Sequence, residues 1–321
     1  MANNIFKNFS QKLPAANHAA TKIQLNPLEC LLIPIDKLTN VLFDIEKEDP
    51  EEILENRKLG ITTPISLTLP KDKHGQDIQL TQFDKLIFWI ALSEQNAGNF
   101  CVSHSRIFHT LGGSQKLNDA PNVKAAITDS LRKLRNTTLT ADLTALTSHF
   151  KSYKRKLETL LGTEIYSNKI ILEDSLLPTK TVTASINGKI TDGVIYFHDI
   201  SILLTIAEMK QQLIHCQPEL LAAPVRSTVQ TLCLKGYLLE RILKIKGSHS
   251  DNRKRVRPLN NTILFDTIYS KCGLADAQKW QKQDFRKSIS TILEHFKTQN
   301  LIKSYEFTKK NGKFYSIIVI F

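Results

Sequence analysis

The sequence predicts an α+β protein made of two similar units, each with three helices and closing strands, preceded by an N-terminal arm. Three observations support this: a helix-helix-helix-strand order occurs twice, a strong hairpin signal lies near the C-terminus, and positive charge is concentrated in the last third. With 321 residues and 41% apolar content, the chain can bury more than one core. We place an arm and acidic segment at residues 1–60, a first domain at 61–224 and a second at 225–321.

The N-terminal segment has the composition of a flexible arm. Residues 1–24 are rich in Ala, Asn and Lys with weak periodicity, and the acidic stretch Asp44–Glu55 predicts a solvated helix. The start lacks the apolar centre of a signal peptide, and no apolar run approaches the roughly 20 residues that span a bilayer. Five scattered cysteines have neither zinc-site nor disulfide spacing. We therefore expect a cytoplasmic protein with reduced thiols.

The first unit begins with a strand, predicted by alternation of Ile65, Leu67 and Leu69. Thr81, with Asp84 three residues later, predicts a capped helix. Ser103 is expected to cap a second helix, which ends at the glycines after Leu111. The periodicity predicts a third helix over residues 122–135 and a strand over 138–143. Three helices and then a strand is the order of a winged helix-turn-helix.

A long insert follows this first set of elements. It contains a Lys-rich helix around Lys151–Lys156 and strand-like segments over residues 164–197. Within the latter, Asn187-Gly188 predicts a hairpin turn, and a helix is expected over residues 199–212.

The second unit repeats the order of the first. Helices are predicted over residues 227–246, 262–271 and 282–299, and strands over 301–307 and 314–321. The tip between the strands holds Asn311-Gly312, a strong hairpin signal that would form the wing.

The third helices of the two units share a register of apolar residues, which we interpret as an internal repeat. Apolar residues occur at offsets 0, 4, 8, 11 and 16 in both, at Val123, Ile127, Leu131, Leu134 and Leu139 and at Phe285, Ile289, Leu293, Phe296 and Leu301.

Charge is distributed unevenly. Residues 225–321 hold 19 Lys and Arg against 7 Asp and Glu, an excess equal to the +12 of the whole chain. A cluster of cations on a folded segment gains by releasing the counterions condensed on phosphates. Nucleic acid is therefore the first partner that the sequence predicts.

The third helix of the second unit has the composition of a recognition helix. If its apolar residues are buried, its outer face carries Lys282, Gln283, Arg286, Lys287 and Ser290. In a major groove, Arg and Lys pair with guanine and Gln with adenine. A solvated face is the alternative, and the clustered charge favours DNA.

Two further groups of cations in this unit are expected to hold phosphate. They are Arg253, Lys254, Arg255 and Arg257 between the first two helices, and Lys309, Lys310 and Lys313 at the hairpin tip. A mobile loop and a solubilising turn are the alternatives. In the first unit, the outward face would present Lys124, Thr128 and Arg132. Asp129 lies among these cations, so a dimer or partner contact competes with DNA there.

Enzyme signatures are missing from the sequence. It has no phosphate-binding Gly-Lys-Ser/Thr loop, no dinucleotide fingerprint and no His-Glu-x-x-His. His104 and His109 flank an apolar helix face, where capping or packing explains them better than a metal. We expect no catalytic residues, no cofactor and no metal.

Residues 61–321 resemble plasmid replication initiator proteins of the tandem winged-helix type. The resemblance lies in Leu80–Asp84, Ser130–Leu134, Tyr237–Ile242 and Asn300–Tyr305. It implies a non-enzymatic initiator that binds repeated origin sequences in duplex DNA and recruits host replication proteins. It also implies a first domain used partly for dimerisation, with dimers able to repress the protein's own gene. The acidic N-terminal 60 residues and the long insert depart from that pattern.

On this resemblance, Arg286, Lys287 and Ser290 would read bases and the hairpin cations would hold phosphate. A transcriptional regulator of the same architecture is the alternative function. A protein-interaction module with a basic face is a third, and it differs from both in not needing DNA.

Overall fold

The computed structural model describes residues 25–35, 39, 42–43, 65–149, 151–161, 164–166, 169–186, 189–199, 201–209, 212–250 and 259–321. These residues form an α+β fold, as the sequence predicts, with its strands in small antiparallel sheets. The arm predicted over residues 1–24 and the acidic helix of residues 44–55 lie outside the described residues.

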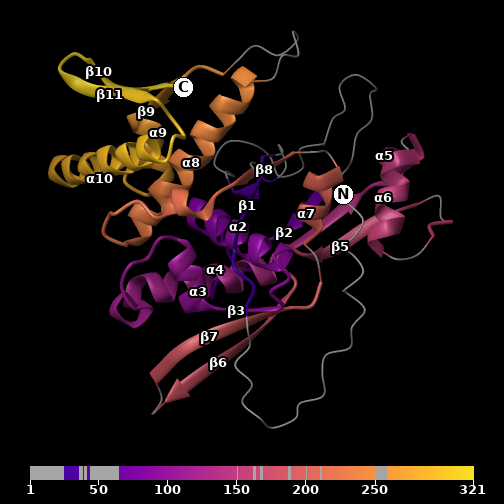
Figure 1. The fold of residues 1–321 in the computed structure, drawn as a ribbon. Helices are drawn as coiled ribbons and strands as arrows, with labels where there is room; N and C mark the ends of the chain where they lie inside the picture. The colour runs from indigo at the N-terminus through magenta and orange to yellow at the C-terminus, as the bar shows by residue number, and fades with distance from the viewer. Residues whose placement is uncertain are drawn as a thin grey trace.

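The first unit is built around helix α2, which lies at the middle of the molecule (Figure 1). The Thr81 hydroxyl accepts from the Asp84 backbone N–H and the Asp84 carboxylate accepts from the Thr81 N–H, so the predicted capping box is confirmed. Ser103 likewise caps the next helix by accepting from the Arg106 N–H. The helices are α2 (Gln82–Asn96), α3 (His104–Thr110), the 3-10 turn η1 (Leu117–Asp119) and α4 (Pro121–Asn136).

The strands of the first unit belong to separate sheets. The strand predicted after α4 forms as β4 (Thr138–Asp142), and it lies between β2 (Ile65–Thr68) and β5 (Ile171–Ser175). The hairpin predicted in the insert forms from β6 (Thr179–Ile186) and β7 (Lys189–Phe197), and its predicted turn residues, Asn187 and Gly188, lie outside the described residues. Alternation predicts that a segment is a strand but not its partner, because pairing is decided by distant residues.

A short strand that the sequence analysis missed completes this sheet. Strand β3 (Cys101–Ser103) lies between α2 and α3 and pairs with β7, so the strand order is β3-β7-β6. Helices α5 (Thr144–His149) and α6 (Lys151–Leu161) lie between β4 and β5 along the chain. The insert therefore separates the third helix of the unit from its hairpin.

Part of the segment assigned to the N-terminal arm belongs to the core, which corrects the arm's extent. All four residues of β1 (Leu31–Pro34) are buried, and β1 pairs with β8 (Leu213–Cys216) and packs against α2. A Leu-Leu-Ile run is strongly apolar, so burying it is favourable. Helix α7 (Ile202–Met209) packs against β1, and the 3-10 turn η2 (Pro218–Leu221) leads to the second unit.

The described residues of the second unit form three helices and one sheet of three strands. Its elements are α8 (Val229–Ser250), β9 (Thr262–Leu264), α9 (Phe265–Lys271), α10 (Lys279–Thr298), β10 (Ser304–Lys310) and β11 (Lys313–Ile320), with strand order β10-β11-β9. The helix predicted from Thr262 begins three residues later, because residues 262–264 pair with β11. At the hairpin tip, Asn311 and Gly312 have φ of 52° and 71°, as a two-residue turn of this kind requires.

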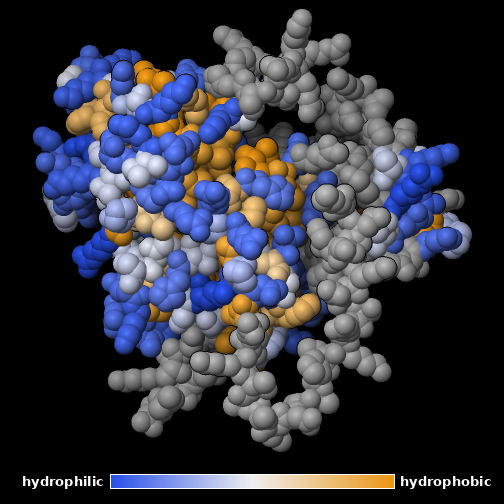
Figure 2. All heavy atoms as spheres, viewed as in Figure 1, coloured by the Kyte–Doolittle hydropathy of each residue, from blue (hydrophilic) through white to orange (hydrophobic). Residues whose placement is uncertain are grey.

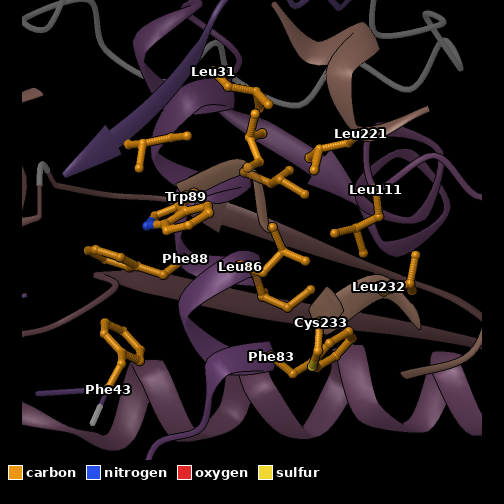
Figure 3. Packing of buried hydrophobic residues seen from close by; sticks show 14 of the residues in the cluster. Leu31, Phe43, Phe83, Leu86, Phe88, Trp89, Leu111, Leu221, Leu232 and Cys233 are labelled. Carbon is orange, nitrogen blue, oxygen red and sulfur yellow. The ribbon is translucent and has the colours of Figure 1, made fainter. Parts of the chain in front are cut away.

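One hydrophobic core joins the two units. Residues on almost every side of α2 are buried, including Phe88 and Trp89. Figure 3 shows α2 side chains such as Leu86 gathered with Leu31 of β1 and with Leu232 and Cys233 of α8. Burying a side chain of this size contributes roughly 1.5 to 3 kcal/mol, so the contact between units is a major part of the fold.

Polar groups are also buried where the units meet. On α2, Lys85 donates to the Glu240 carboxylate on α8 at 2.7 Å. Lys235 on α8 is fully buried, and its Nζ donates to the Gly112 carbonyl oxygen at 3.3 Å. Gly112 has φ of 75°, and a Cβ there would lie 2.1 Å from the Leu221 carbonyl oxygen. Only glycine therefore fits this close approach.

Candidate nucleic-acid interface

Helix α10 separates an apolar face from a basic one. Its buried side chains are Phe285, Ile289, Ile292, Leu293 and Phe296. Of the residues predicted on the outer face, Gln283 and Lys287 are exposed, and Lys287 forms an exposed ion pair with Asp284 at 2.9 Å. Exposed pairs of this kind are weak, so this lysine is available to another anion at little cost.

Arg286 lies at the edge of this face, between α9 and the hairpin. Its Nη1 donates to the Tyr269 hydroxyl at 3.3 Å, and its guanidinium carbon lies 4.9 Å from the centre of the Phe314 ring. The Lys309 ammonium lies 5.0 Å from the centre of the same ring. Phe314 of β11 therefore holds one cation of the helix and one cation of the hairpin close together.

The other two predicted residues of α10 are partly occupied within the protein. Lys282 donates to the Ala275 carbonyl oxygen at 2.6 Å and lies 5.3 Å from the centre of the Tyr269 ring. The Ser290 hydroxyl donates to the Arg286 carbonyl oxygen at 3.2 Å, one turn earlier. Both side chains are half-buried, so the helix offers Gln283 and Lys287 more openly than Lys282 or Ser290.

The hairpin tip combines cations with exposed aromatic rings. Lys309, Lys310 and Lys313 are all exposed, and Lys310 lies 5.4 Å from the centre of the Tyr315 ring. Bases and sugars stack on exposed rings, and phosphates bind the cations beside them. Hydrophilic residues predominate on the surface over α10 at the left of Figure 2, and apolar residues lie among them over the hairpin.

Sequence reasoning missed one prominent residue of this surface. Trp280, near the start of α10, is 60% exposed, and its Nε1 donates to the Gln278 side-chain oxygen at 2.6 Å. The neighbouring Lys279 is also exposed. The sequence did hold a signal for this residue, because Trp280 is an aromatic residue in a polar stretch that precedes the apolar pattern of the helix. We define the basic face as the exposed residues Lys279, Trp280, Gln283, Lys287, Lys309, Lys310 and Lys313 with Arg286 and Phe314.

The corresponding face of α4 is closer to electrically balanced. Arg132 donates to Asp129 at 2.5 Å, and Lys133 lies 3.0 Å from Asp129 and 3.6 Å from Asp84. Desolvation raises the pKa of Asp129, but hydrogen bonds from Arg132 and Lys133 outweigh it, so the net pKa lies below its usual range. The carboxylate is therefore ionised and neutralises part of the basic charge.

The remaining predicted residues of α4 also have partners inside the unit. Lys124 donates to the Asn118 side-chain oxygen at 2.8 Å. The Thr128 hydroxyl donates to the Lys124 carbonyl oxygen at 3.0 Å and lies 3.3 Å from His104 Nδ1. This face therefore presents less available positive charge than the basic face of the second unit.

Four predicted phosphate-binding residues cannot be placed. Arg253, Lys254, Arg255 and Arg257 lie outside the described residues, in the segment between Ser250 at the end of α8 and Leu259 before β9. Their assignment remains a prediction from the sequence.

The described part of the chain contains neither a candidate metal site nor a membrane-spanning helix. Within it, His, Cys, Asp and Glu side chains do not gather in groups of three or more that could hold a metal ion. None of its helices combines the length and the apolarity needed to cross a bilayer.

No protein-family model and no curated protein matches the chain. Two solved structures of RctB are similar to it, each with 14% sequence identity and a TM-score of 0.38. A crystal structure of selenomethionine derivatives of RctB domains 2 and 3 covers 88% of this chain and 98% of its own. Another of RctB domains 2–3 covers 84% of this chain and 90% of its own. These values describe a loose resemblance, from which we draw no conclusion about function.

Proposed function

We propose that this protein is a plasmid-type replication initiator that binds repeated origin sequences in duplex DNA, mainly through its second unit. The observation that carries the DNA-binding part is the arrangement around Phe314, where Arg286 of α10 and Lys309 of the hairpin approach one ring at 4.9 and 5.0 Å. Each unit has the helices and antiparallel hairpin expected of a winged helix, and we interpret both in that way.

In this proposal α10 enters the major groove. Gln283 and Lys287 are exposed on the side away from the core, and Gln can pair with adenine while Lys pairs with guanine. Arg286, supported by Tyr269 and Phe314, would act at the edge of the groove. The hairpin cations would contact phosphates or the adjoining minor groove, which fixes orientation more than sequence.

Charge supports the assignment of binding to this unit. Residues 225–321 carry a net charge of +12. On α4 of the first unit, by contrast, Arg132 and Lys133 are paired with Asp129. Attraction to phosphate scales with the number of cations that displace counterions. We propose that the first unit serves dimerisation, with monomer and dimer in exchange, or docks host replication proteins, and that the protein has no catalytic activity.

A binding experiment with matched variants tests the DNA interface. Electrophoretic shift or fluorescence anisotropy would compare the intact chain, the double variant Gln283→Ala with Lys287→Ala, and the control Lys116→Ala. Lys116 is an exposed lysine of the first unit, outside the basic face. We expect the double variant to lose affinity for flanking origin DNA and the control to retain it. Equal binding by all three would refute the interface.

A replication experiment tests the initiator role separately. The gene with its flanking DNA would be placed on a plasmid that lacks an origin, and the transformants counted. An initiator should support replication, and the double variant should not. If the intact protein binds flanking DNA but never supports replication, the transcriptional regulator is the better assignment. Binding to an acidic protein without any DNA affinity would favour the interaction module instead.

A further inference from the structure

Trp280 is the most exposed aromatic side chain of the basic face. It is the second residue of α10 and is 60% exposed, whereas Trp89 of α2, the other tryptophan of the chain, is 1% exposed. Leaving an indole ring in water is unfavourable, because burial of apolar surface stabilises a fold or a complex. The ring is therefore a surface on which a partner can gain affinity.

The position of Trp280 on α10 aligns it with the residues proposed to read bases. Gln283 follows it by three residues and Lys287 by seven, and residues at these spacings share one face of an α-helix. All three side chains are exposed. Asp284 shares this face, but its carboxylate is paired with Lys287 at 2.9 Å. A ridge of Trp280, Gln283 and Lys287 therefore runs along the first half of α10.

The first turn of α10 holds the indole ring in place. Trp280 Nε1 donates to the Gln278 side-chain oxygen at 2.6 Å. The Gln278 N–H donates to the Gln281 side-chain oxygen at 2.8 Å, within a capping box that closes this turn. An indole has a single N–H donor, and because Gln278 accepts from it, the ring offers apolar carbon atoms to a partner. A ring held in this way also loses little conformational freedom on binding.

Charge selects nucleic acid as the partner of this apolar ring. Lys279 is exposed beside Trp280, and the exposed lysines of the hairpin belong to the same basic face. The N-terminal residues of a recognition helix contact the edges of bases in the major groove. The apolar group on those edges is the C5-methyl group of thymine. An apolar ring on this ridge therefore has its complement at thymine.

We propose that Trp280 packs against a thymine methyl group in the major groove. The second unit then prefers a T·A pair next to the base pairs that Gln283 and Lys287 contact. Three residues of an α-helix rise about 4.5 Å, close to the roughly 3.4 Å step between base pairs, so neighbouring contacts on the ridge match neighbouring base pairs. The inference rests on the proposed DNA-binding function and adds a specificity-determining residue to that site.

Removing the methyl group alone tests this contact. Duplexes from the flanking DNA would be made with thymine or with deoxyuridine, and their affinities measured by fluorescence anisotropy. Burial of one methyl group corresponds to a change in affinity of about fourfold. Deoxyuridine should therefore weaken binding of the intact chain by this factor for each methyl group contacted, and it should have no such effect on Trp280→Ala. Trp280→Phe, which keeps an aromatic ring, should retain part of the effect.

The comparison between variants isolates the side chain. Deoxyuridine also alters the duplex itself, but that change acts on every variant alike, so the difference between proteins reports Trp280. Tyr166→Ala is the matched control, because Tyr166 is an aromatic residue of the first unit with 86% exposure. This control should keep the full sensitivity of the intact chain. Equal sensitivity to deoxyuridine in the intact chain and in Trp280→Ala would overturn the inference.

Acrylamide quenching of tryptophan emission gives a second measurement. Trp89 is buried, so Trp280 supplies the accessible emission, and thymine-containing duplex should protect it from acrylamide. Protection that rises with protein concentration in the absence of DNA would assign the ring to a contact between two copies of the chain. Loss of single-stranded rather than duplex binding in Trp280→Ala would assign it to base stacking. Either result overturns the methyl contact.

Failure of this inference is distinguishable from failure of the proposed function. If the intact chain binds no duplex DNA, the proposed function fails and this inference fails with it. If the intact chain binds duplex DNA with equal affinity for thymine and deoxyuridine, the proposed function stands and this inference alone is overturned.

Discussion

Replacing the buried cation Lys235 with methionine should change how the stability of the protein depends on pH. Lys235→Met keeps the length of the side chain and removes its charge. Burial lowers the pKa of Lys235 from 10.5 to about 8 by desolvation, and the side chain is fully buried. The Lys235 ammonium donates a hydrogen bond to an uncharged group, the Gly112 carbonyl oxygen, at 3.3 Å. The native protein therefore holds this charge at a cost.

The sign follows from which state binds the proton. Between pH 8 and 10.5 the lysine is mostly deprotonated in the native state and mostly protonated in the unfolded state. The unfolded state then binds more protons, so this group makes stability rise with pH in that window. Below pH 8 the cost is present in full. A shift of this size corresponds to about 3 kcal/mol, at about 1.4 kcal/mol for each pH unit.

Urea denaturation of the wild type and of Lys235→Met at pH 7 and pH 10 measures this effect. From pH 7 to pH 10 we expect the wild type to gain roughly 2 to 3 kcal/mol relative to the variant. Tyrosines and cysteines titrate in both proteins, so their contributions cancel in the comparison. Lys116→Met, at an exposed site, should show no such change. A difference between wild type and Lys235→Met that is the same at both pH values would refute the reasoning.

Three further predictions concern DNA. If about 6 phosphates are contacted, a plot of the logarithm of the DNA affinity against the logarithm of the salt concentration should have a slope near −5. If a chain that ends at Pro224 binds DNA as well as the intact chain, the binding site is not in the second unit. Arg286→Ala should cost roughly 1 to 3 kcal/mol at the cognate site and relax base preference, whereas Lys310→Ala should weaken all sequences alike; identical effects on cognate and random DNA would exclude α10 as the reader. Sedimentation should show monomer and dimer in exchange, with direct-repeat DNA favouring bound monomers; a protein that stays monomeric at high concentration argues against the dimer.

The candidate site was predictable where it depends on local pattern. Burying the apolar face of α10 left Gln283 and Lys287 exposed, as helical periodicity requires. Periodicity did not show that Arg286 would be held by Tyr269 and Phe314, since these rings come from other elements. The sequence placed Asp129 among the cations of α4, but its pairing with both Arg132 and Lys133 depends on side-chain geometry.

By itself the sequence determined the α+β class and the elements whose signals are local. The Thr81 and Ser103 caps and the Asn311-Gly312 turn are encoded within a few residues, and each forms as expected. Tertiary structure alone decided the pairing of β1 with β8 and of β4 with β2 and β5. It also placed Lys85 against Glu240, 155 residues away. Local conformation is set by backbone sterics and nearby hydrogen bonds, whereas strand partners and buried ion pairs are selected by the packing of the whole core.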